Sequence, residues 1–288
     1  MGVKIQTIKD TRIYLSRELD GIYQKPEIDA LSNIIIRTVT GVAKLHQLFM
    51  SEQLINLEQA ARIIEITEEL KTGKPIQYIL GETIFYDCIV KLNSATLIPR
   101  PETEELVHLI IKENSGYHGD IIDFGTGSGC IAIALAANIP GSKVTGIDNS
   151  EDAIRIAKEN ALLNNVTVSF LTGDIFNFKD IGIPGAGIIV SNPPYIRNSE
   201  KKIMGKNILD FEPHSALFVN DSEPLIYYEA LLNIADKMLV SGGRLYFEIN
   251  EAMGDLMVRL LYSSGYSDIK LIADINYKDR IIRGTKNE

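Results

Sequence analysis

The residues with the clearest capacity for chemistry lie in the glycine-rich segment Asp123-Phe124-Gly125-Thr126-Gly127-Ser128-Gly129. The segment follows an apolar stretch typical of a strand and precedes one typical of a helix. In an open α/β sheet, ligands bind beyond the carboxyl ends of the strands, where glycines let the backbone approach a ligand and offer it N–H groups. Taken alone, the segment is also compatible with a tight turn that binds nothing. The dinucleotide-binding fingerprint requires glycine at position 130, so Cys130 disfavours NAD.

Two further acids follow the next two predicted strands. The interval from Asp123 to Asp148 is close to the roughly 20 residues that typically separate such a loop from an acid that binds ribose hydroxyls. Asp174 is placed to accept a hydrogen bond from an adenine amino group, although each acid alone would also serve as a cap or turn residue. The pyrophosphate of NAD avoids a nearby anion, whereas Asp123 suits a cationic amine. The three acids therefore favour S-adenosylmethionine as the ligand.

The tetrapeptide Asn192-Pro193-Pro194-Tyr195 follows a fourth apolar stretch and is expected at the same edge of the sheet. Asn192 offers a side-chain carbonyl, and the two prolines lack N–H groups and stiffen the turn, which leaves backbone carbonyls as acceptors. Tyr195 offers a flat face for a planar group. Two acceptors beside a ring predict a clamp for a planar –NH2 group, either a carboxamide or an exocyclic amine. A rigid turn with a packed tyrosine is the alternative.

These segments require a parallel sheet that brings the strand ends together. From about residue 98, strand and helix patterns alternate, which predicts an α/β fold with helices on both faces of the sheet. The predicted strands are 121–124, 143–147, 166–171, 187–191 and 244–249, and the predicted helices are 102–113, 131–138, 151–164 and 224–239. The tail adds strands at 269–273 and 280–284. Their short connection leaves no room for a crossover helix and predicts an antiparallel pair.

The first 75 residues predict a small helical domain. Apolar residues recur at helical spacing in 5–72, with Pro26 in the first turn of one helix. A long helix capped by Ser51 is expected to end at Gly73. Its apolar face is expected to consist of Leu54, Leu57, Ala61, Ile64 and Leu70. Residues 76–97 contain two β-like stretches, 76–81 and 85–92, and are interpreted as a two-stranded linker to a domain of residues 98–288.

Composition and charge limit the classes of function. The chain has 288 residues, of which 45% are hydrophobic and 23% charged, as is typical of a globular protein with a substantial core. The net charge is −9, and residues 98–288 carry −8 of it, which argues against binding nucleic acid or an anionic membrane by charge alone. Two cysteines and four scattered histidines predict neither a disulfide scaffold nor a metal site. Without a signal sequence or a membrane-spanning run, the chain is expected to be cytoplasmic.

The motifs together resemble those of the HemK-type protein-glutamine N5-methyltransferases over nearly the whole chain. The motifs that carry the resemblance are Ile98-Pro-Arg-Pro-Glu-Thr-Glu104, Asp123 to Gly129, Asp148, Ser191-Asn-Pro-Pro-Tyr-Ile196, Phe211-Glu-Pro213, Ala216-Leu217 and Asp279-Arg280. Asn-Pro-Pro-Tyr alone is shared with adenine-N6 methyltransferases, and the 98–104 segment is the more specific marker, because ribosomal-protein glutamine methyltransferases usually diverge after the Pro-Arg pair. The chain departs from the family pattern at Asn250, Met253 and Ile175, where glycine, glutamine and tryptophan are common.

The resemblance implies a class I, Rossmann-like S-adenosylmethionine-dependent methyltransferase domain behind a small N-terminal helical-bundle domain. It implies methylation of the glutamine in the Gly-Gly-Gln motif of class-1 peptide chain release factors, with the N-terminal domain helping to grip the release factor and no direct binding of nucleic acid or membrane. The residues expected to bind the cofactor are Gly125, Thr126, Gly127, Ser128, Gly129, Asp148, Asp174, Ile175 and Asn192. The residues expected to bind the substrate are Asn192, Pro193, Pro194 and Tyr195, with Asn192, Pro193 and Tyr195 as catalytic residues.

In the implied mechanism, Asn192 Oδ1 and the Pro193 carbonyl each accept one N–H of the glutamine amide and favour the positive charge that develops on its nitrogen. Alignment supplies most of the acceleration of an in-line transfer. The alternatives are an adenine-N6 methyltransferase acting on DNA or RNA, a ribosomal-protein glutamine methyltransferase, an NAD enzyme and a non-catalytic nucleotide-binding module. An adenine methyltransferase predicts a basic groove, which the acidic charge of residues 98–288 disfavours.

Two charged groups near these motifs have open roles. Arg197, Lys201, Lys202 and Lys206 form a basic patch directly after Tyr195, which is either a solvated loop or a lid that contacts the substrate protein. Arg100 and Glu102 are expected either to form an ion pair in a linker or to close over the cofactor.

Overall fold

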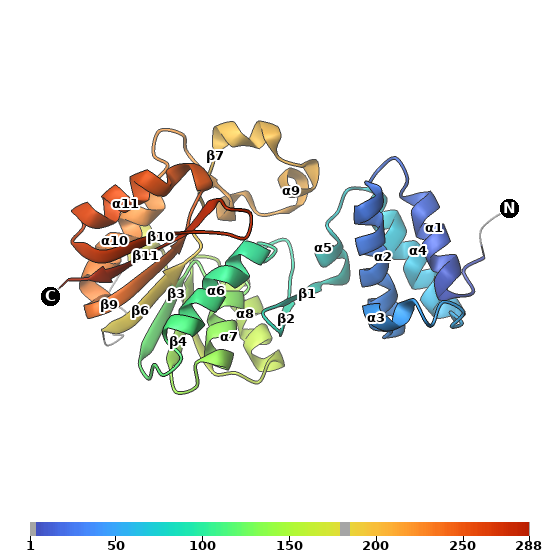
Figure 1. Ribbon diagram of the computed structural model, residues 1–288, viewed down its shortest axis with the longest axis horizontal. Helices are drawn as coiled ribbons and strands as arrows, with labels where there is room; N and C mark the ends of the chain where they lie inside the picture. Colours follow the sequence, from blue (N-terminus) through green and yellow to red (C-terminus); the bar gives the residue numbers. More distant parts are fainter. Residues whose placement is uncertain (1–3, 179–184, 288) are drawn as a thin grey trace. The chain divides into compact units, whose positions relative to one another are not determined.

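The computed structural model describes residues 4–178 and 185–287, and contacts between Cα atoms divide the chain into two units (Figure 1). The helical unit comprises Met1–Leu80 and Lys206–Phe211, and the sheet unit comprises Gly81–Gly205 and Glu212–Glu288. The chain thus passes between units after Leu80, whereas the sequence prediction placed residues 76–97 in a linker. The short helix at Lys206–Phe211 groups with the helical unit, although the sequence prediction included it in the domain of residues 98–288.

The helical unit contains a core formed by its longer helices. Its elements are α1 (Ile8–Glu18), α2 (Lys25–Thr40), α3 (Lys44–Gln47), α4 (Leu57–Lys71), α5 (Ile76–Leu80) and α9 (Lys206–Phe211). Pro26 lies in the first turn of α2 as predicted, and Gly73 follows α4 with a positive φ of 84°. The fully buried apolar side chains of this core are Ile8, Leu15, Leu19, Ile35, Ile36, Ile63 and Ile66.

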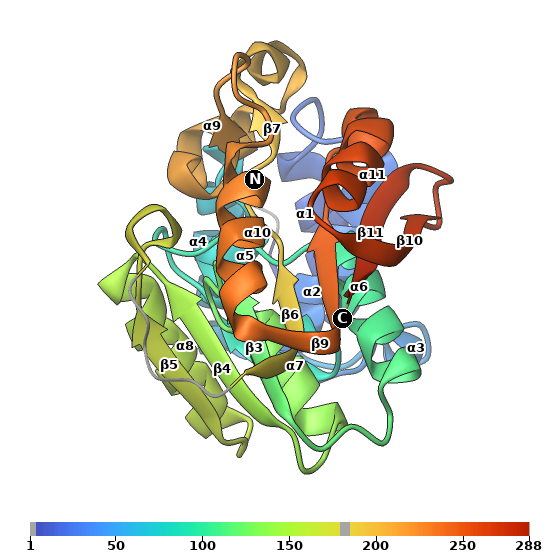
Figure 2. The same cartoon turned by 90° about the vertical axis from the view of Figure 1, so that its left-hand side faces the viewer.

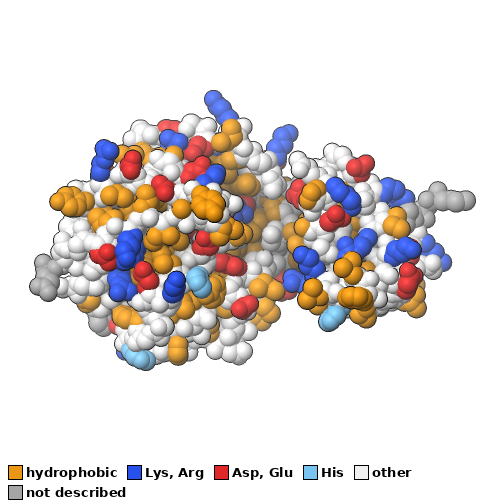
Figure 3. All heavy atoms as spheres, viewed as in Figure 1, with side chains coloured by type: hydrophobic (Ala, Val, Ile, Leu, Met, Phe, Trp, Pro, Cys, Tyr) orange, Lys and Arg blue, Asp and Glu red, His pale blue; other side chains and the backbone are white. Residues whose placement is uncertain are grey.

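The start and the buried face of α4 differ from the prediction. Asn56, not Ser51, caps the helix, and its side chain and that of Gln59 each accept a hydrogen bond from the other's backbone N–H, which forms a capping box. The buried apolar residues of α4 are Ile63, Ile66 and Leu70, whereas Ile64 is half exposed. Leu54 and Leu57 belong to a set of exposed apolar residues in this unit, and Figure 3 shows orange apolar side chains on the lower part of the unit. The set is Leu45, Leu48, Phe49, Leu54 and Leu57.

A seven-stranded sheet forms the centre of the sheet unit. Its strands are β3 (Asp120–Phe124), β4 (Lys143–Asp148), β5 (Val168–Thr172), β6 (Ala186–Ser191), β9 (Leu239–Glu248), β10 (Tyr266–Ala273) and β11 (Asp279–Lys286). They are ordered β10-β11-β9-β6-β3-β4-β5, from right to left in Figure 2. The strands from β9 to β5 are parallel, and β11 pairs antiparallel with both β9 and β10, which confirms the predicted antiparallel tail.

Helices cover both faces of this sheet (Figure 1). α6 (Pro101–Glu113), α7 (Cys130–Asn138) and α8 (Glu151–Leu163) lie on one side, and α10 (Ile226–Met238) and α11 (Gly254–Ser263) lie on the other. Alternate residues of a strand face opposite sides, so Ile122 and Phe124 of β3 pack in one core with the apolar faces of α10 and α11. The α/β fold class is confirmed, while α11 is an element that the sequence analysis did not predict.

The hairpin that precedes α6 belongs to the sheet unit. β1 (Glu82–Phe85) and β2 (Cys88–Lys91) are antiparallel, whereas the predicted β-like stretch at 76–81 is wrong, because residues 76–80 form helix α5. A short apolar run does not distinguish a strand from a buried helical turn. Asn160 of α8 holds β2 by accepting a hydrogen bond from Lys91 N and donating one to Lys91 O.

The segment between β6 and α10 is built from short elements. β7 (Ile196–Arg197) pairs in parallel with β8 (Phe218–Val219), and the segment also contains the 3₁₀ turns η2 (Asn198–Ile203) and η3 (His214–Ala216). Two further 3₁₀ turns lie elsewhere in the sheet unit: η1 (Ile175–Asn177) follows β5, and η4 (Glu251–Met253) follows β9. Within residues 4–178 and 185–287, no helix combines the length and apolar character needed to cross a membrane.

Candidate active site

The register of the parallel strands brings the predicted functional segments to one edge of the sheet. Phe124, the last residue of β3, pairs with Ile147 of β4 and with Ser191, the last residue of β6. Asp148 pairs with Thr172 at the end of β5. The glycine-rich segment, Asp148, Asp174 and Asn192 lie at these strand ends or just after them, which is why residues so far apart in the sequence lie around one site.

A cavity of about 300 Å³ lies at this edge, within the sheet unit. Of the residues predicted to bind cofactor or substrate, those that line it are Gly125, Gly127, Asp148, Asp174, Ile175, Asn192, Pro193 and Pro194. The structure does not bring Thr126, Ser128, Gly129 or Tyr195 into the lining, because Thr126 and Ser128 are buried and Gly129 precedes the first turn of α7. A Cβ at Gly129 would lie 3.0 Å from the Cβ of Ala157, so this glycine allows α7 to pack closely against α8.

The glycine-rich segment contributes open space to the cavity, and its N–H groups are largely used inside the protein. Gly125 N and Thr126 N donate to the Ile147 carbonyl, and Gly127 N donates to Asp148 Oδ2 at 2.8 Å. Gly125 and Gly127 adopt positive φ angles of 70° and 54°, and a Cβ on either would meet a single atom, at 4.0 Å. The expectation that these glycines offer free N–H groups to a ligand is therefore wrong for Gly125 and Gly127, which instead keep side chains out of the cavity.

Asp123 lies beneath the cavity and does not line it. The residue is fully buried, and its Oδ2 accepts a hydrogen bond from Thr126 Oγ1 at 2.6 Å. Burial raises the pKa of this carboxyl to about 7, and the nearby Asp148 carboxylate acts in the same direction. Asp123 therefore supports the glycine-rich segment from below, and the direct contact with a cationic ligand that its sequence position suggested is not part of this geometry.

The other two acids differ in their surroundings. Asp148 Oδ2 accepts from Gly127 N, and its Oδ1 accepts from Ser150 N at 2.9 Å. Burial raises the pKa of Asp148, although the backbone hydrogen bonds counteract the shift. Asp174 is more exposed and accepts from Phe176 N, so that it caps the η1 turn while lining the cavity. Both carboxylates keep acceptor lone pairs that a ligand hydroxyl or amine can use.

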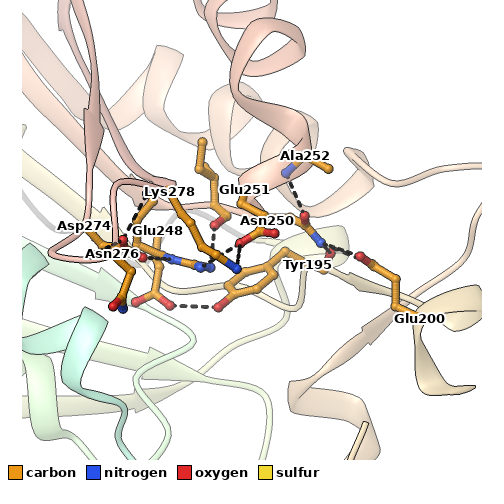
Figure 4. Close-up of polar contacts among 11 residues, drawn as sticks. Tyr195, Glu200, Glu248, Asn250, Glu251, Ala252, Asp274, Asn276 and Lys278 are labelled. Carbon is orange, nitrogen blue, oxygen red and sulfur yellow. Dashed lines mark hydrogen bonds and ion pairs between the residues drawn. The ribbon is translucent and has the colours of Figure 1, made fainter. Parts of the chain in front are cut away.

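The side chains of Asn192 and Tyr195, at the two ends of the Asn192–Tyr195 clamp, contact different partners. Asn192 is half buried, and its Nδ2 donates to Thr103 Oγ1 of α6 at 3.1 Å. The Tyr195 hydroxyl donates to Glu248 Oε1 at 2.9 Å, so its ring is turned toward the end of β9 (Figure 4). Asn250, one of the departures from the family pattern, donates to the Tyr195 carbonyl and to Glu200.

Glu248 connects these contacts. Its carboxylate is fully buried and also accepts a hydrogen bond from Thr103 Oγ1 at 2.7 Å. Burial raises the pKa of Glu248, while the hydrogen bonds from Thr103 and Tyr195 and the charge of Arg280 oppose this shift. Arg280 itself donates to Asp274 and to the Ile249 carbonyl, which holds the antiparallel strand β11 at this end of β9.

The charged groups near the clamp have other partners than the sequence suggested. Arg100 pairs with Glu212 at 2.5 Å, not with Glu102, and Glu212 is buried and also accepts from Ile98 N. This pair joins the segment before α6 to the one after α9. In the basic patch, Arg197 pairs with Glu200, and Lys201 Nζ lies 4.2 Å from the centre of the Phe218 ring.

Several cavity residues had no signal in the sequence analysis. Phe176 and Tyr227 line the cavity and pack edge to face, with ring centroids 5.2 Å apart, next to Ile175. An aromatic wall is therefore present one residue beyond the position where the family commonly has tryptophan. Tyr227 comes from α10, and no sequence spacing relates it to Phe176. Ser215 also lines the cavity, as do Pro213 and Ala216, whose motifs were noted in the sequence without a role.

Comparison with known proteins identifies relatives that match almost the whole chain. Residues 102–211 match the model of the Methyltransferase small domain, and residues 11–81 match that of the PrmC N-terminal domain. A release factor glutamine methyltransferase of Flavobacterium psychrophilum is 41% identical over 96% of this chain and 98% of its own length. One from Bacteroides thetaiotaomicron is 41% identical over 95% of this chain and 98% of its own length.

Among solved structures, a methyltransferase from Pyrococcus furiosus has the same fold. It aligns with a TM-score of 0.52 and 17% identity, over 80% of this chain and 99% of its own. The likeness supports the Rossmann-like architecture, and the closer sequence relatives define the family. The chain, whose strand ends assemble a glycine-rich loop, acidic acceptors and an Asn-Pro-Pro turn around one cavity, belongs to the release factor glutamine methyltransferase family.

Proposed function

We propose that this protein transfers a methyl group from S-adenosylmethionine to the side-chain amide nitrogen of the glutamine in the Gly-Gly-Gln motif of a class-1 peptide chain release factor. The observation that carries the proposal is the position of Asn192 and Pro193 in the lining of the cavity, in a chain 41% identical to curated release factor glutamine methyltransferases. The proposal implies that the enzyme acts in the cytoplasm, where release factors meet ribosomes.

The residues of the cavity suit S-adenosylmethionine. No side chain fills the space above Gly125 and Gly127, so a ligand can lie close to the protein backbone there. Asp148 offers a carboxylate to the ribose hydroxyls. Ile175, Phe176 and Tyr227 provide apolar and aromatic surface for an adenine ring, with Asp174 as an acceptor for its amino group. When bound, the cofactor supplies a methyl group on a positively charged sulfur.

The chain's own contribution to the reaction is to orient the glutamine amide. A carboxamide nitrogen is a weak nucleophile because its lone pair is delocalised into the carbonyl. Asn192 Oδ1 and the Pro193 carbonyl each accept one N–H of the substrate, which fixes the nitrogen and stabilises the positive charge that develops on it. Tyr195, held by Glu248, contributes by stiffening this turn.

The proposal is tested by incubating the protein with methyl-labelled S-adenosylmethionine and a release factor, and in parallel with DNA and RNA that contain adenine. We expect label on the Gly-Gly-Gln peptide only, and none on a release factor in which this glutamine is replaced by alanine. Label confined to nucleic acid, or to a ribosomal protein, would overturn the proposal.

The clamp is tested with Asn192→Ala. Loss of one acceptor to the reacting amide is expected to lower kcat by about 100-fold or more, while the Kd for S-adenosylmethionine changes little. Asn198→Ala is the matched control, because Asn198 follows closely in the chain and its side chain donates to the exposed Asn220, away from the cavity lining. Wild-type kcat in Asn192→Ala would refute the clamp mechanism.

A further inference from the structure

A buried chain of hydrogen bonds runs from β9 to the clamp. Glu248 Oε2 accepts from Thr103 Oγ1 at 2.7 Å, and Thr103 Oγ1 accepts from Asn192 Nδ2 at 3.1 Å. Glu248 and Thr103 are 1% and 2% exposed, so water does not compete for these groups. The three residues come from β9, from the first turn of α6 and from the turn after β6.

The chemistry of the groups gives this chain a direction. An ionised carboxylate accepts hydrogen bonds and donates none, and a hydroxyl has one proton to donate. Since the Thr103 hydroxyl uses its one O–H group in the hydrogen bond to Glu248, it offers only lone pairs to Asn192. The Asn192 amide must then turn its NH2 group toward Thr103. Its Oδ1 lies on the other side of the planar amide and is the atom left for a ligand.

The second carboxylate oxygen is engaged in the same sense. Glu248 Oε1 accepts from the Tyr195 hydroxyl at 2.9 Å, as Figure 4 shows. Both oxygens therefore accept a hydrogen bond from a neighbouring hydroxyl, and Arg280 supplies a positive charge nearby. Rotation of the carboxylate exchanges equivalent oxygens and does not alter the direction of donation.

We propose that Glu248 and Thr103 are positioning residues that fix the orientation of the Asn192 amide, so that the site presents an acceptor and selects a substrate carboxamide over a carboxylate. This inference rests on the proposed function. With Oδ1 and the Pro193 carbonyl facing the substrate, both clamp atoms accept, which matches the two N–H groups of glutamine. A glutamate side chain offers only acceptors and is repelled. Specificity for glutamine thus begins outside the cavity, at a carboxylate that does not contact the substrate.

The first test compares Thr103→Val with Thr103→Ser. Valine removes the hydroxyl with little change in volume, while serine keeps it. Two release factors serve as probes, one with glutamine and one with glutamate at the methylated position, and the Kd of each is measured. We expect wild type and Thr103→Ser to bind the glutamine form at least about tenfold more tightly. Thr103→Val is expected to reduce this ratio to about threefold or less and to lower kcat, while Kd for S-adenosylmethionine stays within about twofold.

The second test addresses Glu248. In Glu248→Gln the carboxamide no longer compels Thr103 to donate toward it, so the binding ratio is expected to fall. In the Thr103→Val background the same substitution is expected to leave the ratio unchanged, because the link to Asn192 is already broken. Tyr228→Phe is the matched control, since the buried Tyr228 hydroxyl donates to the Glu248 backbone carbonyl and not to its carboxylate. It is expected to lower Tm while keeping kcat and the binding ratio.

A third measurement needs no variant. In the folded wild-type protein, nuclear Overhauser contacts are expected between the Asn192 side-chain NH2 protons and the Thr103 methyl group. Absence of these contacts, or a wild-type binding ratio in Thr103→Val or Glu248→Gln, would overturn the inference. These results are distinct from failure of the proposed function, in which wild type itself leaves the release factor unmethylated.

Discussion

At the residue scale, the buried acid beneath the glycine-rich segment has the most direct consequence. Asp123 is fully buried with a pKa raised to about 7, well above that of the same carboxyl in an unfolded chain. Between about pH 4 and 7, the folded protein therefore holds a proton that the unfolded chain has lost. The free energy of unfolding must fall as pH rises through this window.

We expect Asp123→Asn to remove this part of the pH dependence. Asparagine preserves the shape and an acceptor for Thr126, but it does not ionise. The free energy of unfolding is measured by urea denaturation without cofactor at pH 5, 6, 7 and 8. As pH rises, the value for the variant should increase relative to that of wild type, by on the order of a few kcal/mol. Asp120→Asn, at the partly exposed start of the same strand, should parallel wild type. If the free energy of unfolding of Asp123→Asn depended on pH in the same way as that of wild type, the raised pKa of the buried Asp123 would be contradicted.

At the element scale, one asparagine of α8 joins the hairpin to the glycine-rich segment. Asn160 is fully buried, exchanges two hydrogen bonds with the Lys91 backbone and donates a third to the Ser128 carbonyl at 2.9 Å. The hairpin β1–β2 is therefore not only a connection between units. It forms part of the support for the loop that lines the cavity.

Asn160→Ala is expected to lower the free energy of unfolding by about 3 kcal/mol, because it leaves buried backbone groups unpaired. It should also weaken S-adenosylmethionine binding by about tenfold, since the Ser128 carbonyl loses its anchor. Asn164→Ala is the control: Asn164 makes similar bonds to Ile89 but none to the glycine-rich segment. It should cost about 1 kcal/mol and leave cofactor affinity unchanged. Equal effects of the two variants, measured by urea denaturation and calorimetric titration, would refute this role.

At the scale of the whole molecule, the two units have separate cores. The core of the helical unit includes Ile63, and the core described in the sheet unit includes Ile122 and Phe247. The cavity and every residue proposed to bind the cofactor lie in the sheet unit. Cofactor binding should therefore stabilise one unit and leave the other unaffected.

Scanning calorimetry is expected to resolve two transitions. S-adenosylmethionine at a concentration of about 100 times its Kd should stabilise the sheet unit by about 2.7 kcal/mol and leave the transition of the helical unit at the same temperature. Ile63→Ala identifies the helical transition, which it should lower by about 3 kcal/mol. The half-exposed Ile64→Ala on the same helix is the control and should have less than a third of that effect. A single transition that shifts as a whole in both experiments would contradict independent units.

Local patterns were sufficient for much of the fold. The strands β3 to β6 and the helices α6 to α8 were predicted because apolar runs and helical spacing report burial directly. The face of α4 was mispredicted because Leu57 and Ile64 share the same helical spacing as Ile63, Ile66 and Leu70. Which stripe is buried depends on what packs against the helix, and its first turn depends on the Asn56 cap.

The candidate site, too, contains features that the sequence predicts and features that depend on the tertiary structure. Residue types and the order of strands in the chain were enough to predict the glycine-rich segment, Asp148 and the Asn192–Pro194 turn, because parallel strands bring their carboxyl ends to one edge. The partners of the polar side chains could not be predicted from the sequence: Tyr195 donates to Glu248, Arg100 pairs with Glu212, and Asn192 donates to Thr103. Local periodicity acts over a few residues, whereas the direction of a buried hydrogen bond is decided by groups that meet only when distant segments pack. The tertiary structure therefore decides which atom of Asn192 faces the substrate.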